Sequence, residues 1–271
     1  MKEIHIRNKA LKAVTRETAE VAGFLWQRGW AERNAGNISV DITDLLQQEI
    51  FELDSCKLFP LALNYPKLAG RYFLVTGTGK RMRDLVRKPM KSALIIRLNE
   101  DASGYSIVSQ NADNELFMPT SELPTHLGIH QMIVERGSSD KVVMHTHATE
   151  LVALTQSKEL CNKDALNKIL WGMHPETIMF VPDGIGFVPY LLPGSTEIAK
   201  ATIKVLQDHD VAVWEKHGVF AIGESVHDTF DKIDILAKSA CIYFLCRSAD
   251  IIPEGFTEKQ LDELKKLSEN F

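Results

Sequence analysis

Helix-like and strand-like segments alternate along the entire sequence, and this mixture limits what the chain can fold into. Apolar residues recur every three to four positions over residues 8–30, which predicts a first helix. Short alternating or continuous apolar runs predict strands at residues 38–42, 72–75, 93–98, 105–108, 141–145, 177–181, 211–214 and 219–222. Further helices are predicted at residues 44–53, from 121 onward, within 148–172, and at 193–208, 226–247 and 257–269.

No internal repeat, low-complexity tract or linker-like composition interrupts this alternation. Strands and helices that mix along one chain are typical of a sheet covered by helices. We therefore predict one α/β domain over residues 1–271, with a central sheet.

The composition excludes several functional classes. At 45% hydrophobic and 25% charged residues the chain is globular and not disordered. Its net charge of 31 − 36 = −5, without a basic tract, gives no sign of a nucleic-acid surface. Residues 1–7 lack the apolar core of a signal peptide, and no stretch approaches the roughly 18 apolar residues of a membrane helix.

The cysteines give the expected compartment. Cys56, Cys161, Cys241 and Cys246 form no CxxC pair and are too few for a disulfide scaffold. We interpret the apolar run at residues 240–246 as a buried helix face with inert thiols. Together with the start of the chain, this predicts a reducing, cytoplasmic location.

The histidines are the strongest chemical signal. His145 and His147 form an H-x-H pair at the end of a predicted strand, where both rings point to one face, about 7 Å apart at Cα. His217 adds a third imidazole at a second strand–turn junction. Each alone is explained as a hydrogen-bonded core histidine. Together they favour a metal site, because three histidines with an open fourth position are typical of catalytic zinc.

A second histidine pair has a different interpretation. His126 and His130 are four residues apart on a predicted helix face, which makes them a rival metal pair. The segment lacks the His-Glu-x-x-His pattern, and Glu122 precedes both histidines. We therefore interpret them as structural.

Three polar turns are candidates for binding an anion. Residues 119–124 place Thr120, Ser121 and Glu122 at a helix N-terminus, where free N–H groups favour negative charge. The alternative is that Ser121 only caps the helix and Glu122 only favours its dipole. Residues 76–80 and 34–37 add hydroxyls, amides and glycines. Residues 76–80 are not a Walker P-loop, because the Gly-x-x-x-x-Gly-Lys spacing is absent. Such turns would suit one phosphate group if they converge, which spacing cannot show.

These motifs, in this order, resemble the zinc-dependent class II aldolase and epimerase family. The resemblance covers residues 8 to 247 and rests on Gly29–Ser39, Thr76–Lys80, Pro119–Pro124, Met144–Ala148 and Lys216–Phe220. It implies a single three-layer α/β/α domain whose sheet is largely antiparallel.

The resemblance also implies roles for individual residues. His145, His147 and His217 would bind one Zn²⁺ per subunit, and Glu122 would be the catalytic acid/base. The residues implied to contact the substrate phosphate are Asn34, Asn37, Thr78, Thr120 and Ser121, with Thr78 standing where serine is familiar. Family members are commonly C4 homotetramers, in which Glu176 would reach a neighbouring subunit's site.

The implied reaction is a retro-aldol cleavage. The segments 30–34 and 41–70 resemble the branch that cleaves L-rhamnulose 1-phosphate to dihydroxyacetone phosphate and L-lactaldehyde, in rhamnose catabolism. No lysine Schiff base is required, so Lys80 and Lys216 are not expected to act as nucleophiles. The alternatives are cleavage of fuculose phosphate, or 4-epimerisation of a sugar phosphate, on the same scaffold. A more remote alternative is a non-catalytic, adducin-like binding module, which predicts that the metal histidines are lost.

Overall fold

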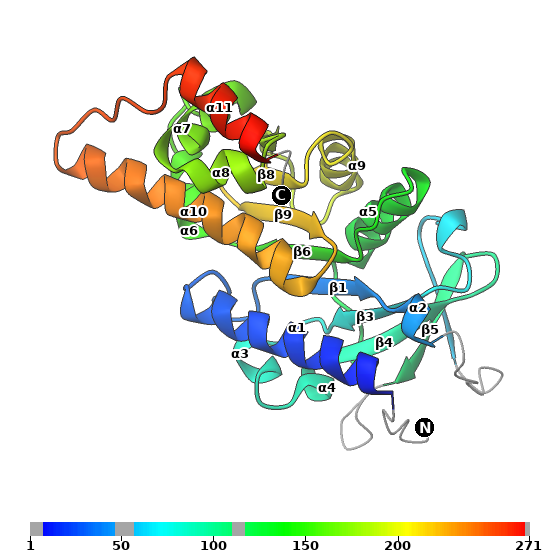
Figure 1. Ribbon diagram of the computed structural model, residues 1–271. Coiled ribbons are helices and arrows are strands. Elements are labelled where there is room, and N and C mark those ends of the chain that lie inside the picture. Colours follow the sequence, from blue (N-terminus) through cyan, green and yellow to red (C-terminus); the bar gives the residue numbers. More distant parts are fainter. Residues whose placement is uncertain (1–7, 47–56, 110–116, 269–271) are drawn as a thin grey trace. The chain divides into compact units, whose positions relative to one another are not determined.

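The structure, a computed structural model, describes residues 8–46, 57–109 and 117–268 and has a mixed α/β fold (Figure 1). A central sheet has the strand order β2-β5-β4-β3-β1-β6-β9-β8-β7 and is flanked by helices. The strands are β1 (Asn37–Asp41), β2 (Leu58–Pro60), β3 (Tyr72–Thr76), β4 (Ala93–Leu98), β5 (Gly104–Ser109), β6 (Val142–Thr146), β7 (Ile185–Val188), β8 (Val211–Trp214) and β9 (Gly218–Gly223). The helices are α1 (Lys9–Gln27), α2 (Thr43–Leu46), η2 (Pro66–Leu68), α3 (Met82–Leu85), α4 (Pro89–Ser92), α5 (Leu123–Glu135), α6 (Thr149–Leu154), α7 (Lys163–Met173), α8 (Pro175–Phe180), α9 (Thr196–Val205), α10 (Val226–Ser248) and α11 (Glu258–Ser268).

The sheet is largely antiparallel, as expected. Strand β1 pairs antiparallel with both β3 and β6, and β4 pairs antiparallel with β3 and β5. Strand β7 pairs with β8 in parallel. The described residues form two compact units: an N-terminal unit of the described residues up to 146 together with 222–227, and a C-terminal unit of residues 147–221 with the described residues from 228 on. The single domain expected over residues 1–271 stays a prediction.

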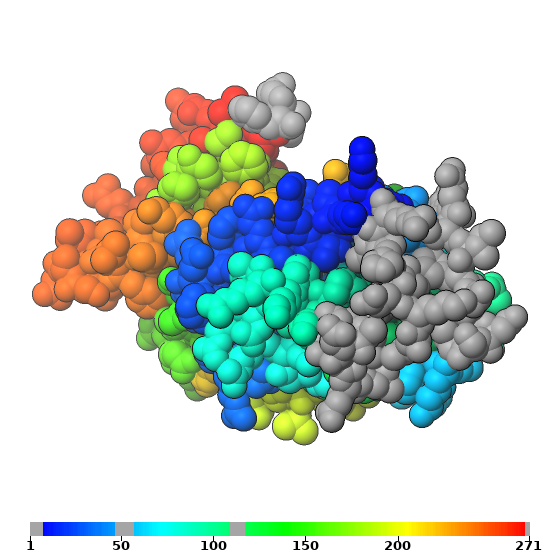
Figure 2. Space-filling model, turned by 90° about the horizontal axis from the view of Figure 1, so that it is seen from below, coloured from blue at the N-terminus to red at the C-terminus, as the bar shows by residue number. Residues whose placement is uncertain are grey.

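In the N-terminal unit, α5 and the η2 turn cover one face of the strands. Phe73 and Val75 of β3 point to that face and pack in one buried cluster with Leu123 and Leu127 of α5. Asn8 caps the start of helix α1, because its side-chain oxygen accepts from the N–H of Leu11 (3.2 Å). Figure 2 shows α1 beside the segment of α3 and α4, which it contacts.

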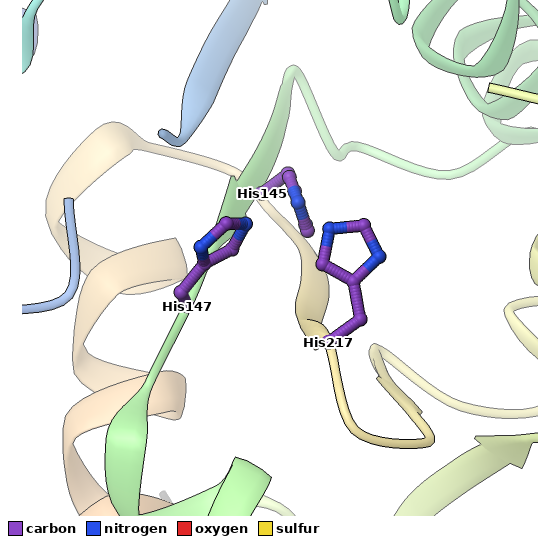
Figure 3. A group of neighbouring side chains, drawn as sticks. All are labelled: His145, His147 and His217. Carbon is purple, nitrogen blue, oxygen red and sulfur yellow. The ribbon is translucent and has the colours of Figure 1, made fainter. Parts of the chain in front are cut away.

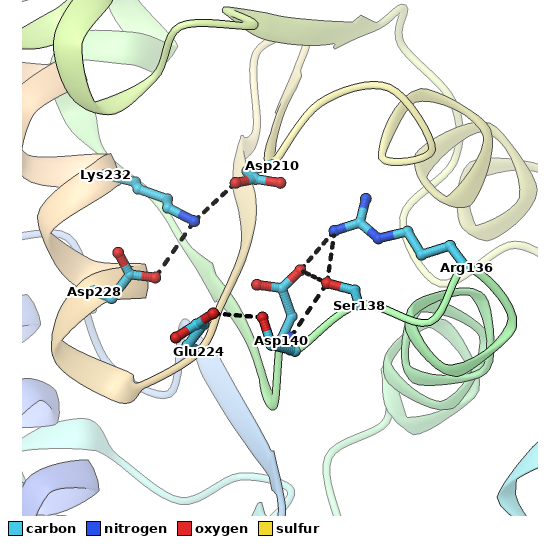
Figure 4. A network of polar contacts seen from close by, with 8 residues as sticks. Arg136, Ser138, Asp140, Asp210, Glu224, Asp228 and Lys232 are labelled. Atoms are coloured by element: carbon cyan, nitrogen blue, oxygen red, sulfur yellow. Dashed lines mark hydrogen bonds and ion pairs between the residues drawn. The ribbon is translucent and has the colours of Figure 1, made fainter. Parts of the chain in front are cut away.

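A polar turn fixes the path from α5 to β6. Arg136, at the end of α5, donates to Asp140 (2.5 Å), which also accepts from the Ser138 hydroxyl (2.6 Å; Figure 4). The Ser139 hydroxyl donates to Glu224. Because Asp140 is buried, these bonds hold the turn in one conformation. The two elements joined by this turn carry several of the candidate site residues.

In the C-terminal unit, side chains define where the helices start. The side chains of Asn162 and Ser195 accept backbone N–H groups at the starts of α7 and α9. Lys232 of α10 pairs with Asp210 (2.8 Å) and Asp228 (3.4 Å), also visible in Figure 4. These bonds satisfy polar groups around β8 and its neighbouring helices.

Two local predictions were wrong. Residues 177–181 are not a strand: Pro175 begins α8 there, because proline suits the first turn of a helix, and the strand of this region is β7. The apolar run at 240–246 is not a buried face, since Cys241 and Cys246 are half-buried and Leu245 is 66% exposed. Cys56 and the predicted helical residues 47–53 lie outside the described residues.

Over residues 8–46, 57–109 and 117–268, no helix is both long and apolar enough to cross a membrane.

Candidate active site

Three histidines lie together as the sequence predicts. His145 is in β6, His147 follows the strand directly, and His217 is in the turn between β8 and β9. One ring nitrogen of each lies within 4.8 Å of the others, and Figure 3 shows the rings turned toward one another. The donor set is three imidazoles, which suits a borderline-soft divalent cation such as zinc and leaves a coordination position for substrate. The side chains present therefore fit a metal ion.

The position of His217 follows from a tight hairpin. Trp214 of β8 pairs with Gly218 of β9, and Lys216 turns the chain with a φ of 57°. The Lys216 N–H donates to the Thr155 hydroxyl (2.8 Å), which fixes this turn. The rings of His217 and Trp214 make an edge contact, with centroids 5.0 Å apart. The imidazole is thus held by packing as well as by the turn.

Glu122 stands at the start of α5, close to the first histidine. Its Oε2 accepts from the Asn37 side-chain N–H (2.8 Å) and lies 3.9 Å from Nε2 of His145. Asn37 and His145 are direct partners across β1 and β6. The paired strands β1 and β6 therefore place Asn37 and His145 side by side next to the Glu122 carboxylate.

Two of the three predicted anion turns come together. Gly77 and Pro119 form an antiparallel bridge, and the Thr78 N–H donates to the Met118 carbonyl (2.9 Å). The Thr120 N–H donates to the Thr76 carbonyl (2.9 Å). The side chains of Thr78 and Ser121 are exposed at this junction, whereas Thr120 is buried and its hydroxyl accepts the N–H of Glu122 (3.3 Å). Backbone bonds thus join the turn of residues 76–80 to the turn that carries Glu122.

The third turn is placed by Gly36. This glycine has a φ of +80°, and a Cβ there would lie 3.2 Å from the carbonyl oxygen of His145. The backbone of residues 34–37 therefore approaches β6 closely, and both this approach and the positive φ favour glycine. Asn34 is exposed in this turn, and its contact with a phosphate stays a prediction. Asn37 is buried, and its side chain bonds to Glu122.

The second histidine pair has a role that the sequence did not reveal. His126 and His130 are fully buried, and both hydrogen-bond to the hydroxyl of Ser39 in β1 (2.7 and 2.8 Å). Burial lowers the pKa of both rings, that of His130 to about 4, so both are neutral near pH 7. The burial of His126 and His130 agrees with their interpretation as structural histidines. Asn37 and Ser39 are two residues apart in β1 and therefore share one face of the strand, but their contact with the histidine pair depends on how α5 packs.

The fold and this arrangement define an α/β enzyme with a candidate metal site beside a carboxylate. The family model for the class II aldolase and adducin N-terminal domain matches residues 16–244, and the chain belongs to this family. Rhamnulose-1-phosphate aldolase of Bacteroides thetaiotaomicron is 44% identical over 97% of this chain and 97% of that protein. Rhamnulose-1-phosphate aldolase of Listeria monocytogenes is 34% identical over 94% of this chain and 92% of that protein. The family and these relatives identify the chain as a lyase.

A solved structure gives the same result for the fold. The crystal structure of a sugar-phosphate aldolase from Thermotoga maritima has a TM-score of 0.76 and 32% identity, covering 91% of this chain and 100% of that one. The predicted fold class is therefore confirmed.

Proposed function

We propose that this enzyme cleaves L-rhamnulose 1-phosphate to dihydroxyacetone phosphate and L-lactaldehyde, in rhamnose catabolism, with one Zn²⁺ per subunit held by His145, His147 and His217. The observation that carries the proposal is the position of Glu122, 3.9 Å from a histidine of a three-imidazole group whose ring nitrogens lie within 4.8 Å. The names of relatives that match nearly the whole chain support the same substrate.

Cleavage of the C3–C4 bond leaves its electron pair on C3, while the C4 hydroxyl would give its proton to the Glu122 carboxylate and become an aldehyde. A bound divalent cation would supply Lewis-acid stabilisation for the charge that develops on the neighbouring C2 oxygen. Glu122 would deliver a proton to C3 and remove it in the reverse direction, as a general acid and base. Its Oε2 already accepts the Asn37 N–H, so Oε1 is the oxygen that would carry this proton.

The substrate phosphate would bind at the joined turns. The exposed hydroxyls of Thr78 and Ser121, together with Asn34, Asn37 and Thr120, would offer neutral donors. Asn37 uses one side-chain N–H for Glu122, so its amide retains only one N–H for substrate. Neutral donors and backbone N–H groups hold phosphate without a basic cluster, which agrees with a net charge of −5.

The proposal extends to assembly and compartment. The enzyme would be a cytoplasmic homotetramer. Exposed apolar side chains at the end of α10 and beyond support self-association: Leu245 is 66% exposed and Ile252 77%. Glu176 lies at the start of α8, where it pairs with His174 (3.0 Å), and would reach a neighbouring subunit's site.

The alternatives differ in their products. A fuculose-type enzyme would prefer a different stereoisomer, and a 4-epimerase would return a ketose phosphate without releasing triose phosphate. An adducin-like module would lack metal ligands, and this chain retains all three histidines.

A coupled assay for dihydroxyacetone phosphate across rhamnulose, fuculose and ribulose 1-phosphates tests the proposal. We expect triose phosphate from rhamnulose 1-phosphate at the highest kcat/KM, and none after chelation. Conversion to a C4 epimer without triose phosphate, or a clear preference for fuculose 1-phosphate, would contradict it.

A further inference from the structure

A continuous line of buried polar side chains runs behind Glu122. His130 Nε2 bonds to Ser39 Oγ (2.8 Å), and Ser39 Oγ bonds to His126 Nδ1 (2.7 Å). His126 Nε2 bonds to Asn37 Oδ1, and Asn37 Nδ2 donates to Glu122 Oε2 (2.8 Å). The two rings, Ser39 and Asn37 are all buried.

This line of hydrogen bonds forms because two residues along strand β1 span nearly the same distance as one turn of helix α5. Asn37 and Ser39 are two residues apart in β1, a spacing of about 6.6 Å on one face of the strand. His126 and His130 are one helical turn apart in α5, a rise of about 6 Å. Where α5 packs on the sheet, each strand side chain therefore meets an imidazole.

The protons in this line have one consistent arrangement. A carboxylate only accepts, so the Asn37 NH₂ group faces Glu122 and its carbonyl oxygen faces His126. That oxygen requires N–H at Nε2 of His126. Because burial holds the pKa of His126 well below its ordinary value, the ring is neutral and its Nδ1 accepts.

The remaining two bonds follow. Since Nδ1 of His126 accepts, the single hydroxyl proton of Ser39 donates to it. Ser39 Oγ must then accept from His130, which requires N–H at Nε2 of that ring. Every donor in the line therefore points toward Glu122, and such aligned bonds strengthen one another.

We propose that Ser39, His126 and His130 are positioning residues: they hold the Asn37 amide in the one orientation that donates to Glu122. The inference rests on the proposed function only for its kinetic consequence. If the amide turned over, its carbonyl oxygen would face the Glu122 carboxylate. The fixed amide keeps Oε2 occupied and leaves Oε1 of Glu122 for the substrate proton.

The histidine tautomers test this directly and without substrate. NMR of the full-length protein with ring-labelled histidine, assigned with His126→Asn and His130→Asn variants, reports which nitrogen carries the proton. We expect neutral rings with N–H at Nε2 for both, and a changed His126 tautomer signal in Ser39→Ala. A wild-type His126 ring that is charged or protonated only at Nδ1 would overturn the inference.

Kinetics provide the second test, with a matched control. Ser39→Ala removes the central hydroxyl, whereas Ser239→Ala removes another buried hydroxyl, one bonded to Thr177 (2.6 Å). We expect Ser39→Ala to lower kcat roughly tenfold, as is usual for hydrogen-bond partners behind a catalytic site, with less change in KM. Equal kcat in the two variants would overturn the inference. A wild type without aldolase activity would instead overturn the proposed function, and the tautomers would still decide the inference.

Discussion

Replacing Gly77 with alanine should separate the two turns that form the proposed phosphate site. A Cβ at this position would lie 2.5 Å from two ring carbons of Phe117 and 3.0 Å from Cγ of Lys80. Carbon atoms do not approach to 2.5 Å without bonding, and Phe117 is buried, so its ring must move. The cost of such overpacking is about 2 kcal/mol.

The control for this substitution is Gly79→Ala in the same turn. Gly79 has a φ of +67° and open space around it, so alanine there costs backbone strain of about 1 kcal/mol and causes no clash. A second change, Phe117→Leu, should relieve the clash at Gly77 and leave the strain at Gly79. The two positions are thus distinguished by their coupling to Phe117.

Scanning calorimetry of the single and double variants measures these effects. For a chain of this length, about 2 kcal/mol lowers Tm by roughly 4–8 °C. We expect Gly77→Ala to lose stability and to raise KM, and Phe117→Leu to restore about 1 kcal/mol only when combined with it. A Tm within about 1 °C of wild type, or strict additivity with Phe117→Leu, would refute the reasoning.

Two further predictions concern histidines. Burial lowers the pKa of His130 from 6.5 to about 4, so between these pH values the unfolded chain binds a proton that the native state does not. The contribution of His130 to the free energy of unfolding, about 3 kcal/mol, is therefore complete above pH 6.5 and is lost as pH falls toward 4. Denaturation of wild type and His130→Asn between pH 4 and 7 should show a shallower pH dependence for the variant, and parallel curves would contradict this. His217→Ala should lose most of the bound zinc, measured by elemental analysis. The control is His209→Ala, which removes a half-buried histidine bonded to the Asp183 carbonyl and should keep about one ion per chain. Equal metal contents in the two variants would remove His217 from the ligand set.

The sequence predicted most of the fold because periodicity follows burial. Helix α1 and strands β1, β3 and β4 lie within a few residues of the predicted ranges, since α1 buries one face and each strand is buried along nearly its whole length. The error at residues 177–181 arose because Thr177 and Ile178 favour strands locally. Tertiary contacts decide otherwise there: both are buried in a helix, and the Thr177 hydroxyl bonds to Ser239.

The site was predictable where chemistry depends on residue type. The H-x-H pair and the third histidine indicated a metal site, and the structure brings His145, His147 and His217 together. The bonds between Ser39, Asn37 and the second histidine pair were not predictable. They depend on how α5 packs on the sheet, a contact between segments some 90 residues apart that no local pattern encodes.

Proton exchange on dihydroxyacetone phosphate tests the central claim most directly. The zinc-loaded enzyme in D₂O, without any aldehyde, should place deuterium at C3 of this product, because Glu122 would remove and return that proton. Glu122→Gln keeps an oxygen that accepts the Asn37 N–H, so it should retain zinc and fold but exchange at least 100-fold more slowly, at the low end for loss of a general base. NMR of the C3 protons gives both rates. Equal exchange in the two proteins, at equal zinc content, would contradict the account.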